Sequence, residues 1–74
     1  MMIKVSSALK QEDIKELLNS YDEDGLEFNY VKKEGIALFF ETNATDLEET
    51  AAKVKKLIKS QPWGPVLFFQ VIPA

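Results

Sequence analysis

The stretch Gly35-Ile36-Ala37-Leu38-Phe39-Phe40-Glu41 contains five apolar residues in a row between a glycine and a glutamate. A strand with one face in water alternates apolar and polar side chains, so an unbroken apolar run is typical of a strand in the middle of a sheet. We therefore predict that residues 35–41 form a central strand, around which the other elements pack.

A second strand is predicted directly upstream, because Leu26, Phe28 and Tyr30 alternate with other residues and define one apolar face. The segment Lys33-Glu34-Gly35 follows it. A three-residue connection with glycine last is typical of a type I turn plus a bulge. The two strands should then form an antiparallel hairpin in which Phe28 lies near Phe40, Tyr30 near Leu38, and Val31 near Ala37.

The two ends of the chain also have strand patterns. Ile3 and Val5 alternate with polar residues and predict a short strand over residues 2–6. The apolar run 66–72, interrupted by Gln70, predicts a last strand over these residues, and Pro73 follows it.

Two helices are predicted between these strands from apolar stripes. Residues 10–21 carry a stripe at i, i+3, i+4 and i+7, preceded by Ser6 and Ser7 as candidate caps. Thr45 with Glu48 has the spacing of a capping box for a second helix that ends near Ser60. The two stripes consist of Ile14, Leu17, Leu18 and Tyr21, and of Leu47, Ala51, Val54 and Ile58. Between the first helix and the second strand, residues 22–25 predict a solvated turn.

The resulting order βαββαβ resembles the ferredoxin-like superfold, which is built from two split βαβ units. The resemblance implies an α+β sandwich with a four-stranded antiparallel sheet and both helices on one face. Strands one and three would be central. Seventy-four residues make one domain, so we expect a single unit over residues 1–74.

Alternation along the strands assigns side chains to the two faces of this sheet. The face covered by the helices is predicted to hold Ile3, Val5, Leu26, Phe28, Tyr30, Ile36, Leu38, Phe40, Leu67, Phe69 and Val71. The open face is predicted to hold Met2, Lys4, Glu27, Asn29, Val31, Ala37, Phe39, Glu41, Val66, Phe68, Gln70 and Ile72. Two aromatic rings inside a polar rim have the anatomy of an interface. The candidate partner contacts on this face are Phe39, Phe68, Val31, Ala37 and Met2.

Trp63 is a further candidate contact, in the segment Gln61-Pro62-Trp63-Gly64-Pro65. A single exposed tryptophan would be a typical binding hot spot. The alternative, which we favour, is that the ring covers one end of the core of a small domain.

Composition argues against several classes of function. The chain has no histidine, cysteine or arginine, so it lacks an imidazole base, a thiolate and a guanidinium clamp. We expect no enzyme activity, no cofactor and no metal site. The RNA-recognition motif shares the topology, but its stacking aromatics are replaced here by Ile36 and Leu38. The net charge of −3 also argues against nucleic-acid binding.

The remaining expectation is an interaction module that forms a homodimer or binds a protein partner through the open sheet face. The alternative is a small-molecule-sensing regulatory domain similar to the ACT domains, which have the same topology. A thermal-shift screen separates the two, because a ligand of the native state raises the melting temperature. The sequence has no secretory leader pattern and no run that could span a bilayer, so we expect a cytoplasmic protein.

Overall fold

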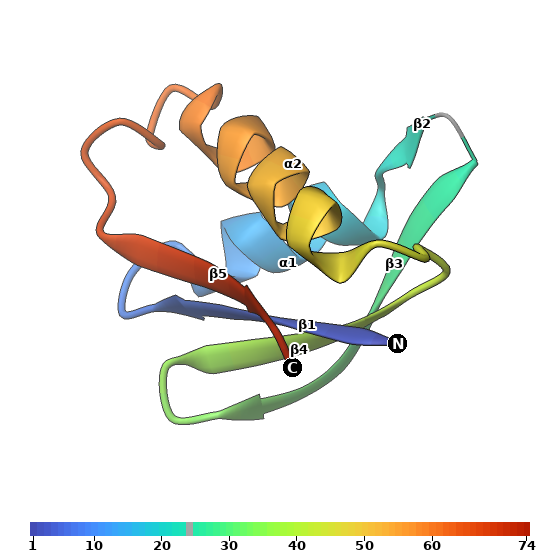
Figure 1. The fold of residues 1–74 in the computed structure, drawn as a ribbon. Helices are drawn as coiled ribbons and strands as arrows, with labels where there is room; N and C mark the ends of the chain where they lie inside the picture. Colours follow the sequence, from blue (N-terminus) through green and yellow to red (C-terminus); the bar gives the residue numbers. More distant parts are fainter. Residues whose placement is uncertain (24) are drawn as a thin grey trace.

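The computed structural model describes residues 1–23 and 25–74 and places two helices on one side of a curled antiparallel sheet (Figure 1). The elements in chain order are β1 (Met2–Ser7), α1 (Gln11–Asn19), β2 (Asp22–Glu23), β3 (Leu26–Glu34), β4 (Ala37–Thr42), α2 (Leu47–Lys59) and β5 (Phe69–Pro73). The strand order is β2-β3-β4-β1-β5. The prediction of a central strand is confirmed, since β4 lies between β3 and β1, although it begins at Ala37 instead of Gly35.

The α+β class with both helices on one face is confirmed, but the sheet has five strands where four were predicted. The additional strand β2 pairs Asp22 with Glu27 and Glu23 with Leu26. Acidic residues beside a glycine predicted a solvated turn there, and Asp24 of that turn lies outside the described residues. Gly25, just before β3, has a positive φ of 73°, a backbone conformation that favours glycine.

The core lies between the helices and the sheet, and it follows the predicted periodicities. Its members are Ile3, Val5, Ile14, Leu18, Phe28, Leu38, Phe40, Val54 and Ile58, all at most 2% exposed. The Tyr30 ring meets Phe40 edge-on with centroids 5.9 Å apart, and Tyr21 meets Phe28 in the same way at 5.7 Å. Such contacts add specific geometry to the burial of apolar area.

Both predicted helix starts are wrong by one or more residues. The residue before α1 is Lys10, with a left-handed φ of 59° and no capping side chain, whereas the Ser7 hydroxyl donates to the Leu9 carbonyl at 2.7 Å. At α2 the cap is Asp46 and not Thr45, because the Asp46 carboxylate accepts the Glu49 N–H at 3.1 Å. A carboxylate at this position also interacts favourably with the positive end of the helix dipole.

The predicted hairpin register is also wrong. Phe28 lies opposite Thr42 and not Phe40, Tyr30 lies opposite Phe40, and a bulge follows at Val31, so that Lys32 opposes Phe39. The strands are joined through Gly35 and Ile36 alone, since Glu34 pairs with Ala37. Gly35 has a positive φ of 61°, which suits the first central position of a two-residue type II′ turn.

Two face assignments near the strand ends are corrected. Ile36, predicted to be covered, is 54% exposed because it occupies the turn and not the strand. Phe68, predicted to lie within the last strand, precedes β5, because pairing with β1 begins only where Phe69 meets Ser7. No helix within the described ranges is long and apolar enough to cross a membrane.

Candidate interaction surface

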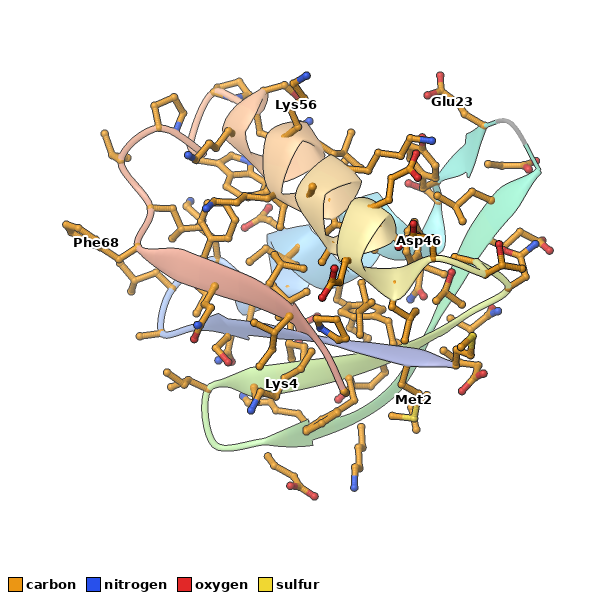
Figure 2. The ribbon with its side chains drawn as sticks, viewed as in Figure 1. Met2, Lys4, Glu23, Asp46, Lys56 and Phe68 are labelled. Carbon is orange, nitrogen blue, oxygen red and sulfur yellow. The ribbon has the colours of Figure 1, made fainter. Side chains whose placement is uncertain are left out.

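The side of the sheet away from the helices, called here the open face, is assembled from alternate residues of the four longer strands. Ile3, Val5 and Ser7 are buried toward the helices, so the residues between them point the other way. Figure 2 shows Met2 and Lys4 on the side opposite Lys56 of α2. The register adds the remaining members of the open face, which are Ser6, Asn29, Val31, Lys32, Glu34, Ala37, Phe39, Glu41, Gln70 and Ile72.

Phe39 lies at the centre of the open face. Lys4 is its direct neighbour on β1 and Lys32 its direct neighbour on β3. The Lys32 ammonium lies 5.1 Å from the Phe39 ring centroid and 2.9 Å from the Glu34 carboxylate. The ring is therefore partly buried beneath a flexible lysine, which a partner could displace, and the cation–π contact at an exposed site is worth about 0.5 to 1 kcal/mol.

The other predicted contacts on this face lie around Phe39. Val31 is at the bulge between Tyr30 and Lys32 and is 49% exposed. Ala37 and Met2 are both partly buried. Ala37 lies two positions before Phe39 on β4, and Met2 lies on β1 opposite Glu41. Ile72 lies across β1 from this centre, paired with Lys4. The structure thus brings together Phe39, Val31, Ala37 and Met2 on one face.

Phe68 lies apart from this group, and Figure 2 shows its ring projecting from the molecule just before β5. It is 95% exposed, and Val66 is 83% exposed. Leu9 and Ile36 are also exposed. The end of β1 connects the segments that carry these residues, because the Ser7 N–H donates to the Ile36 carbonyl at 2.9 Å and Ser7 pairs with Phe69. We call Leu9, Ile36, Val66 and Phe68 the apolar end of the molecule.

Sequence reasoning missed the apolar end as a unit. Ile36 was assigned to the core by alternation, and Leu9 falls outside the helix stripe and carried no assignment. One signal was available: Leu9 precedes the helix and fits no apolar period, which is typical of an exposed loop residue. Only the return of β1 beside β5 and beside the β3–β4 turn brings these four side chains to the same end.

Trp63 is partly buried and packs against the core. It borders a shallow groove that is also lined by Gln61, by Ser20, and by Asp13, Glu16 and Leu17 of α1. The ring position agrees with the favoured interpretation that Trp63 covers the end of the core next to α1.

We expect the fluorescence of Trp63, the single tryptophan of the chain, to be blue-shifted and partly protected from acrylamide in the isolated protein. The physical reason is that packing against apolar side chains removes part of the indole from water. Emission spectra and quenching constants of the native and urea-unfolded protein provide the measurement. Native emission at the wavelength of the unfolded chain would show a free ring and would restore Trp63 as a partner contact.

A polar hollow beside the start of α2 is lined by Asn43, Asp46, Thr50 and Lys53, among others. Several of these groups already have structural partners. The Asn43 side chain donates to the Gly25 carbonyl at 2.7 Å and accepts the Glu27 N–H at 2.9 Å, while Asp46 caps the helix. The hollow is therefore explained by the packing of the β2–β3 turn against the β4–α2 loop.

Among the described residues, no group of three or more His, Cys, Asp or Glu side chains is placed so that it could hold a metal ion. Comparisons of the chain with protein-family models, curated proteins and solved structures found no match.

Proposed function

We propose that this protein is a non-catalytic interaction module of ferredoxin-like topology that associates with a second copy or a protein partner through its open sheet face. The order β3-β4-β1-β5, antiparallel at every step, supports the topology, with β2 as a short addition at one edge. A sheet of this topology has one face that the helices leave uncovered, and we propose that association occurs through that face.

The observation that carries this proposal is the one-sided covering of the sheet. Both helices pack on the same side, and the opposite side keeps Phe39, Val31, Ile72 and Met2 around its centre. Asn29, Glu41 and Gln70 lie around this group, whereas Lys4 and Lys32 flank Phe39 directly, with Lys4 between Phe39 and Ile72. Apolar side chains with polar residues around them are the composition of a protein interface, and the apolar stems of the two lysines can pack within it.

The position of the lysines supports a protein partner over a nucleic acid. Lys53, Lys55, Lys56 and Lys59 are exposed on α2, on the helical side of the molecule, and Figure 2 shows Lys56 there. On the open face, Lys4 and Lys32 are accompanied by Glu34 and Glu41. A surface that binds phosphates needs an excess of positive charge along the contact. Absence of cysteine is compatible with a reducing compartment, and we propose the cytoplasm.

We expect Phe39→Glu to weaken self-association by roughly tenfold or more, since burial of a phenylalanine ring contributes about 1.5 to 3 kcal/mol. The new carboxylate would lie between Lys4 and Lys32, so the monomer should stay folded. Sedimentation equilibrium or light scattering over a wide concentration range gives the association constant, and circular dichroism reports the fold.

The matched control is Ala52→Glu, which adds the same charge at an exposed position of α2. It should leave the association constant unchanged. A wild-type protein that is monomeric at every concentration would eliminate self-association through this face and restrict the proposal to a different protein partner. An associating protein that is insensitive to Phe39→Glu would refute the open face as the contact.

A further inference from the structure

The outer edge of β5 exposes backbone hydrogen-bonding groups whose positions follow from the ladder. The Ala74 N–H donates to the Met2 carbonyl at 2.9 Å, which marks Met2 and Ala74 as a hydrogen-bonded pair. Alternation makes Lys4 and Ile72 the next such pair and leaves Val71 facing outward. The bond from the Ser7 N–H to the Ile36 carbonyl agrees, because it directs the odd residues of β1 toward β4. Phe69 and Val71 therefore present N–H and C=O groups to the outside.

The opposite edge of the sheet is protected. There β2 pairs with Leu26 and Glu27, the Tyr30 N–H donates to the Asn19 side chain at 3.0 Å, and β3 ends in Lys32-Lys33-Glu34. Short flanking strands and charged residues are the usual means of preventing edge-to-edge pairing. At the β5 edge the comparable device is Pro73, which lacks an N–H and occurs where outward pairing would otherwise continue.

The β5 edge is also uncharged. Residues 65–74 contain no Asp, Glu, Lys or Arg, whereas 28% of the whole chain is charged. Two copies can therefore approach along this edge without bringing like charges together, although each molecule has a net charge of −3. An uncharged edge beside a side chain that is 95% exposed, Phe68, fits a second copy of the same edge.

We infer that two copies pair β5 against β5, antiparallel, about a two-fold axis at Gln70, a contact at the sheet edge that is separate from the proposed one around Phe39 on the open face. In this register Phe69 of each copy lies opposite Val71 of the other, and each such pair exchanges both of its N–H to C=O bonds. Pro73 lies outside the paired segment, so its missing N–H costs nothing. An axis at Val71 would instead set Pro73 opposite Phe69 and leave a Phe69 carbonyl without a donor in each copy.

The same register gives Phe68 a contact. It places Phe68 opposite Ile72 of the second copy on the open side of the sheet, and Gln70 opposite Gln70. These are non-hydrogen-bonded pairs, in which the side chains approach most closely. Each copy would bury on the order of 500 Å² through the Phe68 ring, Ile72 and the outer side of β5, near the lower limit for specific association. The dimer is therefore expected to dissociate on dilution.

A cysteine cross-link tests the register directly, because the natural chain contains no cysteine. Residues on the axis lie opposite their own copies at about 4.5 to 5.5 Å between Cα atoms, within the range of a disulfide. Gln70→Cys should therefore form a covalent dimer on mild oxidation, at least roughly tenfold faster than the controls. The controls are Ile72→Cys, on the same strand but off the axis, and Lys55→Cys, on α2. Phe68→Lys introduced into the Gln70→Cys protein should slow cross-linking without changing the fold.

The outcomes separate this inference from the proposed function. Equal cross-linking of Gln70→Cys and Lys55→Cys overturns the inference, and if Phe39→Glu still dissociates the wild-type dimer, the open-face proposal stands alone. Rapid cross-linking of Gln70→Cys together with an association constant unchanged by Phe39→Glu supports the edge and refutes the face. Fast cross-linking of Ile72→Cys instead of Gln70→Cys places the axis elsewhere and overturns the register.

Discussion

Phe40→Ala should destabilise the fold by about 3 to 5 kcal/mol. The ring is fully buried, lies between Ile3 and Tyr30 across the sheet, and meets the Tyr30 ring edge-on. Truncation removes its transfer free energy and leaves a cavity between the sheet and the helices. A 74-residue domain has about 4 to 11 kcal/mol of total stability, so the substitution should remove from about a quarter to all of it. Urea denaturation followed by circular dichroism measures the difference.

Phe39→Ala is the matched control, because it is the same change at the next residue of the same strand. Phe39 points to the open face and is only partly buried beside Lys32, so truncation should cost about 1 kcal/mol. Equal losses for the two variants, or a larger loss at Phe39, would contradict the assignment of faces along β4.

Gly64→Ala should lower the free energy of unfolding by about 2 to 4 kcal/mol, which is more than a substitution at an ordinary exposed loop residue would cost. A Cβ atom at this position would lie 2.0 Å from the Ile58 carbonyl oxygen and 2.9 Å from the Lys59 Cα. Both are backbone atoms at the end of α2, where the Ile58 carbonyl also accepts the Gln61 N–H at 3.1 Å. The loop would have to move away from the helix and would carry Trp63 and Leu67 away from the core. The change in unfolding free energy and the Trp63 emission should report this together.

Gly35→Ala separates this steric effect from backbone strain. Gly35 has a positive φ of 61°, but no atom lies within 4 Å of a Cβ placed there. Its replacement should therefore cost only the backbone penalty of a positive φ, about 1 to 2 kcal/mol, without steric overlap. Gly64→Asn should be as damaging as Gly64→Ala or more so. If Gly64→Ala is no worse than Gly35→Ala, the close packing of the loop on α2 is wrong.

The local patterns of the sequence were sufficient for both helices, for the four longer strands and for most of the core. Ile3 and Val5 alternate and are buried, and Ala51, Val54 and Ile58 follow the helical period and are buried. These signals are local, because a side chain's direction along a helix or strand depends only on its position in the repeat. Phe39 was placed on the open face by the same rule. That placement held because the register error at Phe28 was two residues, and an even shift leaves every side chain on its face.

The tertiary structure decided the register, the bulge at Val31, the positions of Ile36 and Phe68, and the protection of the sheet edges. The predicted connection was the three-residue loop that ends at Gly35, whereas the structure has a two-residue turn over Gly35 and Ile36, and this register depends on contacts between the strands such as the one between Tyr30 and Phe40. The apolar run 66–72 likewise contains no residue that shows where strand pairing begins. Pairing begins at Phe69 because β1 ends at Ser7, its partner. The period of a single segment shows which of its sides is apolar. Strand register and the protection of sheet edges depend instead on contacts between two segments, and the sequence of one segment alone does not determine them.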